Sequence, residues 1–435
     1  MSAPLGAEAE GRTTQALGGN RLVPLPDPIA QDYLLLALRL DQHIPGLVDG
    51  YFGPANLKAD VDMEQLRSPA RLAEDAVALR ERLAGEVANP VRQAWLAAQL
   101  LALATQAAAL AGRALLYLEH ASRCFDWRPG LTPEAELAAA AAALETLLPG
   151  RGPLADRLAA WDEALTIPVE RVPAVVDWLV DRFRSRAAAD FGLPDGERLT
   201  VGLVSGKPWS GYNWYDGGLR SRVELNTDLP IRAPDLIRVV AHETYPGHHL
   251  EHACKEAGLV LERRRLEHAI LLINTPECLI SEGLANLAER FAVPRAEEVD
   301  LLAELLARGG VAAAAGEGSA RQLAARTAAM RDARARLGAI GGNAAILRHV
   351  EGRSRAAVLD YLVEVGGQSR QRAEQRLDFI EHPLWRTYVL VYTEGEALLG
   401  RWLDQTSGPG PRERFARLLR EPLTPSGVAA DLVPG

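Results

Sequence analysis

The sequence predicts a mainly α-helical protein with one small antiparallel β element. From Pro28 onward the apolar residues follow the spacing of amphipathic helices through most of the chain. Alanine is abundant, and it is the best helix former and small enough for close helix packing. One stretch, at about residues 197–228, instead alternates β-forming and polar residues. We therefore expect a large multi-helix fold in which this β element directly precedes a histidine-rich helix.

The predicted elements follow one another with proline or glycine between them. The first helix begins at Asp27-Pro28, a cap residue followed by a first-turn proline. The next predicted helices span 66–86, 90–120, 133–148, 152–165 and 172–190. In the β stretch, Gly217-Gly218 separates two alternating runs, which predicts two or three antiparallel strands. After a histidine-rich helix that starts near Pro234, further helices are predicted at 259–274, 277–291, 296–307, 319–337, 343–351, 355–365, 368–379 and 384–404.

The domain organisation is predicted to be simple. Residues 1–25 are polar and rich in glycine, alanine and threonine, which is typical of a disordered arm. Residues 26–405 are expected to form a single helical domain, which a cleft could divide into two lobes. The Gly/Pro-rich end, 406–435, predicts a short helix and a loose tail.

Composition excludes several classes of protein. The net charge of −9, from 48 basic and 57 acidic residues, argues against a nucleic-acid partner. The three cysteines (Cys124, Cys254 and Cys278) have no CxxC spacing, so we expect a reducing compartment and no disulfide framework. The most apolar stretch, Leu137–Leu148, is too short to span a bilayer, and the N-terminus has no apolar signal segment. The sequence thus predicts a soluble, cytoplasmic protein with no membrane partner.

Residues 239–252, VVAHETYPGHHLEH, contain the pattern most suggestive of chemistry. In the usual H-E-x-x-H zinc motif a second histidine stands four residues after the first, but here that position is Pro246. Glu243 directly follows His242, as it does where one residue binds zinc and its neighbour activates a water molecule. Four of the nine histidines fall within eleven residues: His242, His248, His249 and His252. This clustering favours a metal site.

Two later histidines compete for the position of second ligand. In an unbroken helix His248 would point about 120° away from His242, whereas His249 would return to within about 20° but lie about 10.5 Å along the axis. Pro246 must interrupt the helix, and Gly247 permits an unusual turn. A bulge or wide turn there would bring His248 round to His242. We favour His248, with His249 as the alternative.

The third ligand of a catalytic zinc site is expected on the following helix, PECLISEGLANLAERF. Glu282 stands among apolar neighbours, which predicts that it points inward, whereas Glu277 fits a capping position. Asn286 or Glu289 could accept a hydrogen bond from the free ring nitrogen of a ligand histidine.

The same residues permit a plainer interpretation. Pro246-Gly247 could be a loop between two helices, with the histidines as surface residues, and we expect this for His252 and His268. Cys254 and Cys278 are predicted to be buried apolar side chains rather than ligands.

The stretch HETYPGHHL resembles the H-E-x-x-P-G-H signature of a large bacterial family known only as a domain of unknown function, number eight-eight-five, which is grouped with gluzincin-like zinc peptidases. Three other stretches are similar to that family: LRLDQHIPGLVDGYFGP, S-E-G-x-A at 281–285 and Y-x-x-G at 392–395. The resemblance covers about residues 30–405. It implies a metallopeptidase-like, mostly helical fold with a deep cleft and one Zn²⁺ ion. By this resemblance His242, His248 and Glu282 bind the metal and Glu243 is the general base.

The predicted reaction is hydrolysis of a peptide bond, most readily in short peptides. Zinc would lower the pKa of bound water to about 7, and Glu243 would take the proton and pass it to the leaving amine. Tyr392 is either the hydrogen-bond donor to the oxyanion or a packing residue. Four aromatic residues could form substrate subsites beside an edge strand that pairs with an extended peptide, or they could instead be the packed core of a hairpin: Trp209, Tyr212, Trp214 and Tyr215.

Two other functions are compatible with the sequence. A metal-dependent amidase or esterase acting on a small metabolite would keep the metal and change the bond. A non-catalytic helical binding protein would need no turnover, and the proline at the usual ligand position keeps this alternative open.

Overall fold

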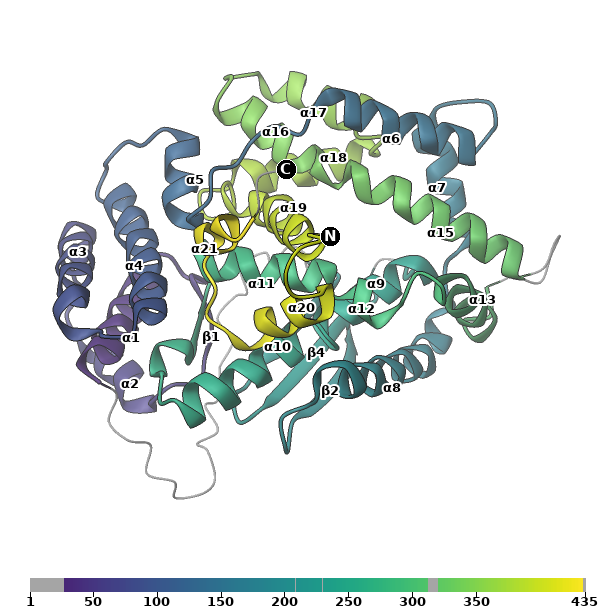
Figure 1. The fold of residues 1–435 in the computed structure, drawn as a ribbon. Helices are drawn as coiled ribbons and strands as arrows, with labels where there is room; N and C mark the ends of the chain where they lie inside the picture. Colours follow the sequence, from purple (N-terminus) through teal and green to yellow (C-terminus); the bar gives the residue numbers. More distant parts are fainter. Residues whose placement is uncertain (1–26, 208, 229, 312–319, 433–435) are drawn as a thin grey trace.

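Helices make up most of the protein, which confirms the mainly α prediction (Figure 1). The computed structural model describes residues 27–207, 209–228, 230–311 and 320–432. The arm predicted at residues 1–25 lies outside these ranges. Helix α1 begins as expected, since the side chain of Asp27 accepts a hydrogen bond from the backbone nitrogen of Ala30 at 2.9 Å.

The elements of the first half of the chain are α1 (Pro28–Asp41), β1 (Val48–Tyr51), α2 (Ala55–Met63), α3 (Pro69–Glu86), α4 (Pro90–Leu110), α5 (Tyr117–Phe125), α6 (Glu134–Leu147), α7 (Leu154–Ala164), η1 (Val169–Arg171), α8 (Val172–Phe191), β2 (Arg198–Val204), β3 (Gly211–Tyr215) and β4 (Arg220–Asn226). The central elements are α9 (Ala233–Glu243), α10 (His248–Lys255), the π-helix η2 (Glu256–Glu262), η3 (Leu266–His268), β5 (Ile270–Leu272), α11 (Pro276–Leu287), α12 (Glu289–Ala292) and α13 (Glu298–Arg308). The remaining elements are α15 (Ala320–Arg336), η4 (Leu337–Ala339), α16 (Ile340–His349), α17 (Arg355–Glu364), α18 (Arg370–Glu381), η5 (Tyr388–Leu390), α19 (Val391–Leu403), α20 (Pro411–Arg420) and α21 (Pro425–Ala430).

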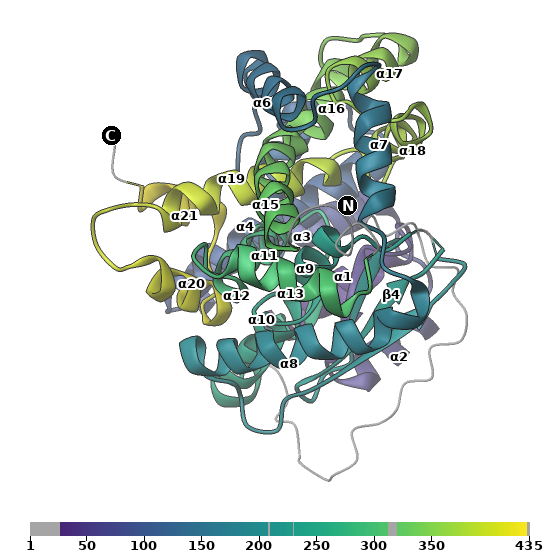
Figure 2. The same cartoon turned by 90° about the vertical axis from the view of Figure 1, so that its right-hand side faces the viewer.

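Helices α11 and α19 lie at the centre of the molecule. Figure 1 shows α1, α3 and α4 on one side of them, and both views place α6, α7 and α16–α18 above and α8 with strand β4 below (Figure 2). One continuous cluster of buried apolar side chains runs through all these groups. Within the described ranges, none of the helices combines the length and apolarity that crossing a membrane requires.

The predicted β element is a three-stranded sheet in the order β2-β4-β3. The antiparallel prediction is right for β3 with β4 and wrong for β2 with β4, which run parallel. Strand β4 buries alternate residues (Ser221, Val223 and Leu225), whereas β2 is largely exposed, so β4 takes the central place. The β3–β4 turn uses Gly217 and Gly218 at φ 73° and 64°, a region that favours glycine.

A second, two-stranded sheet was not predicted. Strand β1 pairs antiparallel with β5, which replaces the last part of the helix predicted at 259–274. These strands have three or four residues, too few to produce a recognisable alternation, and only the tertiary fold brings them together. The helix predicted at 90–120 also divides, because α4 ends at Leu110 and α5 begins at Tyr117.

The C-terminal segment is packed rather than loose as far as residue 432. In place of the predicted short helix and tail it forms α20 and α21, which bury the apolar side chains of Phe415, Leu418, Leu419 and Val428. Their apolar spacing was obscured by the prolines and glycines around them.

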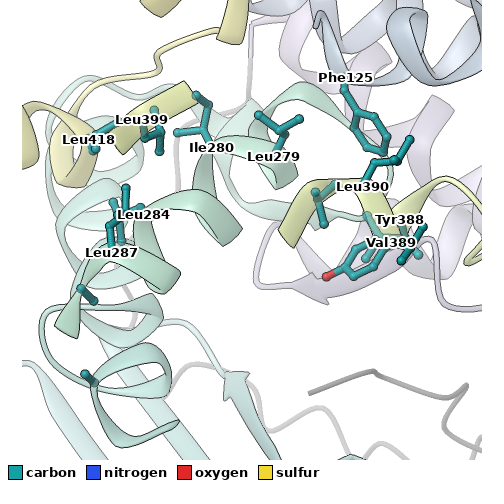
Figure 3. Packing of buried hydrophobic residues seen from close by; sticks show 14 of the residues in the cluster. Phe125, Leu279, Ile280, Leu284, Leu287, Tyr388, Val389, Leu390, Leu399 and Leu418 are labelled. Carbon is teal, nitrogen blue, oxygen red and sulfur yellow. The ribbon is translucent and has the colours of Figure 1, made fainter. Parts of the chain in front are cut away.

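Helices α11 and α19 cross at a pair of glycines. A Cβ atom added to Gly395 would lie 2.4 Å from the carbonyl oxygen of Leu279 and 3.1 Å from the Cα atom of Gly283. A Cβ atom on Gly283 would lie 2.6 Å from the carbonyl carbon of Gly395. The backbones therefore touch, and around them the buried leucines of α11 pack against α19 and the η5 segment (Figure 3).

The substitution Gly395→Ala should lower the free energy of unfolding by about 1–3 kcal/mol or more, because the added methyl group overpacks the crossing. Gly400→Ala, in the same helix, is the matched control, since nothing lies within 4 Å of the added Cβ atom. It should leave stability unchanged or raise it by up to about 1 kcal/mol. Urea denaturation measures both, and equal effects would show that the crossing is not tight.

Candidate metal centre

The histidine motif forms two helices separated by a turn. Helix α9 ends at Glu243, residues 244–247 are not helical, and α10 begins at His248. At Gly247 a Cβ atom would lie 2.0 Å from the carbonyl oxygen of His242, so only glycine fits. The predicted break at Pro246-Gly247 is confirmed, but it is a turn between two helices and not a bulge within one.

The turn brings His248 beside His242. Their ring centroids are 4.6 Å apart and the rings are nearly perpendicular, at 89°. Glu282, on α11, completes the group: its Oε2 lies 3.6 Å from Nε2 of His242 and its Oε1 lies 3.9 Å from Nε2 of His248. Ligand atoms of a tetrahedral zinc site lie about 3.3 Å apart, given metal–ligand distances of about 2.0–2.2 Å. These three side chains are therefore spaced to share one ion.

The carboxylate of Glu282 has one satisfied oxygen and one unsatisfied oxygen. The hydroxyl group of Tyr388 donates to Oε1 at 2.8 Å, whereas Oε2 is buried and has no hydrogen-bond partner among the described residues. Burial lowers the pKa of His242 well below its usual value, so its ring is neutral and supplies no charge to Oε2. Burial raises the pKa of Glu282, although the charge of His248 and the hydrogen bond from Tyr388 oppose the shift. A buried carboxylate oxygen without a donor is unfavourable, and a cation among these side chains would satisfy it.

The ring of His248 is oriented by neighbours on its other side. Ser281 donates its single hydroxyl proton to Oε2 of Glu251 at 2.5 Å, so the Nδ1 atom of His248, 3.2 Å from the Ser281 oxygen, must be the donor there. In the neutral ring this leaves the lone pair on Nε2, the atom that faces Glu282. Burial alone would lower the pKa of His248, but Glu251, Glu282 and Glu243 outweigh it and raise that pKa to about 9. Without a metal ion the ring therefore carries a second proton near neutral pH, which a bound cation would displace from Nε2.

Asn286 and Glu289 are the residues predicted to support a ligand histidine. Asn286 lies close enough to His242 to raise its pKa, against the lowering effect of burial. Its amide oxygen accepts a hydrogen bond from Arg238 at 3.1 Å, and its amide nitrogen donates one to the backbone carbonyl of Tyr392 at 3.1 Å. The supporting role predicted for Asn286 stays a prediction. Glu289, the other candidate for that role, instead forms an ion pair with Arg331.

A second group, His248, Glu251 and His252, also has closely spaced ligand atoms. The amino group of Lys255 already neutralises Glu251 at 2.7 Å and also contacts Glu277 at 3.0 Å. A cation would have to displace this lysine, so we assign the group to orienting His248. The ring of His252 stacks on that of His248 at 5.6 Å, and burial lowers the pKa of His252 to about 3.

The expectation that His252 and His268 lie at the surface is wrong. His252 lines the same cavity as His248, and His268 is buried against the ring of Trp95 with a centroid distance of 4.2 Å.

His249 faces away from the group. Its Nε2 lies 2.8 Å from Oε2 of Glu197 and its Nδ1 lies 2.8 Å from the hydroxyl oxygen of Ser221. Glu197 also accepts hydrogen bonds from Tyr245 and Arg184. Burial raises the pKa of Glu197, but these donors outweigh it and lower that pKa to about 2. His249 therefore fastens α10 to the three-stranded sheet, and of the two candidates only His248 lies beside His242 and Glu282.

Glu243 is buried and lines the cavity beside the three candidate ligands. Burial raises the pKa of Glu243 to about 7, and the charges of Glu282 and Asp49 add to the effect while His248 opposes it. The backbone carbonyl of Glu243 accepts a hydrogen bond from the amide nitrogen of Asn213 at 2.7 Å. A carboxyl group with this pKa can exchange a proton near neutral pH.

Tyr392 lines the cavity as well, and its ring packs edge-on to that of Tyr388 at 5.4 Å. Burial raises the pKa of both tyrosines well above the usual value, so both hydroxyl groups stay protonated. Sequence reasoning missed the hydrogen bond of Tyr388 to Glu282. The partners are 106 residues apart in the sequence, which left no local signal.

Of the four aromatic residues predicted to form subsites, only Tyr212 lines the cavity. Trp209 and Tyr215 are buried, and Trp214 donates its ring N–H to Glu224 at 3.0 Å. Sequence reasoning also missed Asp49, whose only signal was its place in the stretch LRLDQHIPGLVDGYFGP.

The cavity has a volume of about 100 Å³. It is lined by residues of β1, β3, α9, α10, β5, α11, η5 and α19: Asp49, Gly211, Tyr212, Asn213, His242, Glu243, His248, Glu251, His252, Leu271, Leu272, Ile273, Glu277, Cys278, Ser281, Glu282, Tyr388 and Tyr392.

Comparison with known proteins gives little further information. No family model matches the chain, and no curated protein matches it. Among solved structures, a protein described as a putative lipoprotein from Colwellia psychrerythraea superposes with a TM-score of 0.42 at 13% sequence identity, over 87% of this chain and 78% of that one. The resemblance of the histidine motif to a peptidase family therefore stays a prediction.

The contacts of Glu197 predict how stability depends on pH. Because the pKa of Glu197 is lowered from 4.5 to about 2, its stabilising contribution is fully present above pH 4.5 and is lost as the pH falls towards 2. The substitution Glu197→Gln should therefore reduce the free energy of unfolding most near neutral pH, and progressively less below about pH 4.5.

Urea denaturation of both proteins from neutral to acidic pH measures this difference. Glu262→Gln, at an exposed glutamate, should behave as the wild type does at every pH. If the loss caused by Glu197→Gln were independent of pH, the ionised carboxylate would not be its source.

Proposed function

We propose that this protein is a zinc-dependent hydrolase of peptide bonds, in which His242, His248 and Glu282 bind a single Zn²⁺ ion. One observation carries this proposal: the Oε2 atom of Glu282 is buried, faces a neutral imidazole and lacks a hydrogen-bond partner within the part of the chain that the structure describes. A divalent cation among the three side chains would supply the missing partner. Two imidazole nitrogens and one carboxylate are a donor set that suits zinc and leave a coordination position open.

Bound zinc would polarise the substrate carbonyl group and acidify a water molecule. Glu243, with a pKa of about 7, is suited to accept a proton from that water and to return it to the leaving amine. Tyr392 is suited to donate a hydrogen bond to the oxyanion, because it lines the cavity and its hydroxyl group stays protonated. The hydroxyl proton of its neighbour Tyr388 is already donated to Glu282.

Strand β3 supports a peptide substrate in particular. It lies at the edge of the β2-β4-β3 sheet, and its residues Gly211–Asn213 line the cavity. An extended peptide could pair with such an edge and so place its scissile bond beside Glu243.

The small volume of the cavity favours a second candidate, a metal-dependent amidase or esterase acting on a small metabolite. The residues that bind metal and transfer protons would be the same. Comparing turnover of short peptides with that of simple amides and esters distinguishes the two. A non-catalytic binding protein would show no turnover with either class. A cytoplasmic location stays a prediction.

The substitution Glu243→Gln should abolish most activity without releasing zinc. We expect one Zn²⁺ per chain in both proteins and a fall in kcat of about 10²- to 10⁴-fold, because the variant cannot accept a proton. Elemental analysis and turnover of a peptide library measure the two effects, with Glu262→Gln as the surface control. Full activity in the variant would refute the role of Glu243, and wild-type protein that binds no zinc would refute the proposal.

The adjacent histidines offer a matched pair of variants. His248→Gln should weaken zinc binding by more than about 100-fold, since even a residue that only supports a ligand is worth about 10- to 100-fold. His249→Gln should lower the melting temperature but leave zinc affinity nearly unchanged, because His249 contacts Glu197 and Ser221. Zinc titration against a chelating indicator measures affinity, and the reverse order would assign the ligand role to His249.

A further inference from the structure

The cavity has a second acidic feature, Asp49, that the proposed metal chemistry does not use. It reaches the cavity from β1, more than 190 residues before the histidine motif. In the β1–β5 ladder, Val48 pairs with Leu272 and Gly50 pairs with Leu271, so Asp49 is the extra residue of a β-bulge. Bulges next to active sites commonly redirect a side chain.

The carboxylate of Asp49 is held in place from β3. The hydroxyl group of Tyr212 donates a hydrogen bond to its Oδ1 atom. The ring of Tyr212 lies 5.6 Å from that of Trp209 and 4.4 Å from that of Trp214, which fixes its direction. The charge of Asp49 acts on Glu243, Glu282 and Tyr388, so it lies close to the groups assigned to catalysis.

The cavity lining favours a cation over an anion as the part of the substrate that enters it. Its acidic residues are Asp49, Glu243, Glu251, Glu277 and Glu282, and no lysine or arginine is among the lining residues of the described chain. The amino group of Lys255 neutralises the charges of Glu251 and Glu277 by forming an ion pair with each. Glu282 faces His242, the other candidate metal ligand on its Oε2 side. A carboxylate at the end of a substrate would meet several acidic side chains here and no lysine or arginine to bind it.

A neutral acceptor, the side chain of Asn213, lines the same cavity and follows Tyr212 in β3. The amide oxygen of Asn213 is buried, lines the cavity and has no hydrogen-bond partner within the described chain. An ammonium group brings three donors, which an aspartate and an amide oxygen can accept. The cavity volume of about 100 Å³ has room for a short chain end and little room for a long side chain.

We propose that Asp49 binds the α-ammonium group of the substrate, so that the enzyme acts on the amino-terminal residue of a peptide or on a small aminoacyl amide. The cleavage part of this inference rests on the proposed function, whereas the binding of the ammonium group by Asp49 does not. It names the substrate class: molecules with a free, positively charged amine next to the bond that is cleaved.

Binding to the zinc-loaded full chain tests the inference, with L-alaninamide, N-acetyl-L-alaninamide and N-acetyl-L-lysinamide as probes for calorimetry. Wild-type protein should bind L-alaninamide roughly 10- to 100-fold more tightly than either acetylated probe, as expected for a hydrogen bond to a charged group. Asp49→Asn, which keeps the side-chain shape, should lose this preference. Asp216→Asn removes the same charge from an exposed position and should keep it.

Three outcomes would overturn the inference. Equal binding of L-alaninamide and its acetylated form would remove the need for an α-ammonium group. Equally tight binding of N-acetyl-L-lysinamide would assign the site to a side-chain amine. Loss of a second zinc equivalent in Asp49→Asn would make Asp49 a metal ligand.

Hydrolysis of L-alanine p-nitroanilide and of its N-acetyl form separates this inference from the proposed function. Cleavage of the free amine alone, with a raised KM in Asp49→Asn, supports both. Cleavage of the acetylated substrate at an equal rate supports the hydrolase and refutes the role of Asp49. If neither substrate nor any library peptide is cleaved, the proposed function fails, while the binding measurements still decide the role of Asp49.

Discussion

The carboxylate of Glu282 is the constraint on which the centre of this protein depends. A charge removed from water is costly unless hydrogen bonds or an opposite charge replace the water. Tyr388 serves one oxygen, and the other faces His242, whose burial keeps it neutral. The groups around this oxygen form a place for a cation, and three separate helices, α9, α10 and α11, each contribute one side chain to it.

Two backbone contacts make that convergence possible, and both depend on glycine. Without a side chain at Gly247, the chain can turn against the carbonyl oxygen of His242 and start a new helix with His248. Without side chains at Gly283 and Gly395, α11 and α19 can touch, which holds Tyr388 over the carboxylate of Glu282. The glycines of the P-G-H, S-E-G and Y-x-x-G stretches are thus explained by close approach rather than by chemistry.

The sequence predicted what local patterns determine. It predicted the mainly helical fold, the capped start at Asp27, and a break that brings His248 rather than a four-residue neighbour to His242. It could not predict that Asp49 reaches the cavity and contacts Tyr212, or that Tyr388 contacts Glu282, because the partners in each pair are distant in the sequence. Strands β1 and β5 were not predicted for the same reason, because strands of this length are stable only when they pair in the folded chain.

The two neighbouring histidines show how the β element takes part in the centre. Successive residues of a helix point about 100° apart, so His248 and His249 cannot face the same way. With His248 directed at the cavity, His249 is directed at the sheet, where it meets Ser221 of β4 and Glu197 just before β2. Glu197 also binds Tyr245, within the turn itself. Strand β4 and the residue before β2 therefore anchor the turn and the start of α10. A helix that follows a proline break could leave the turn in many directions, and these contacts fix the direction of α10.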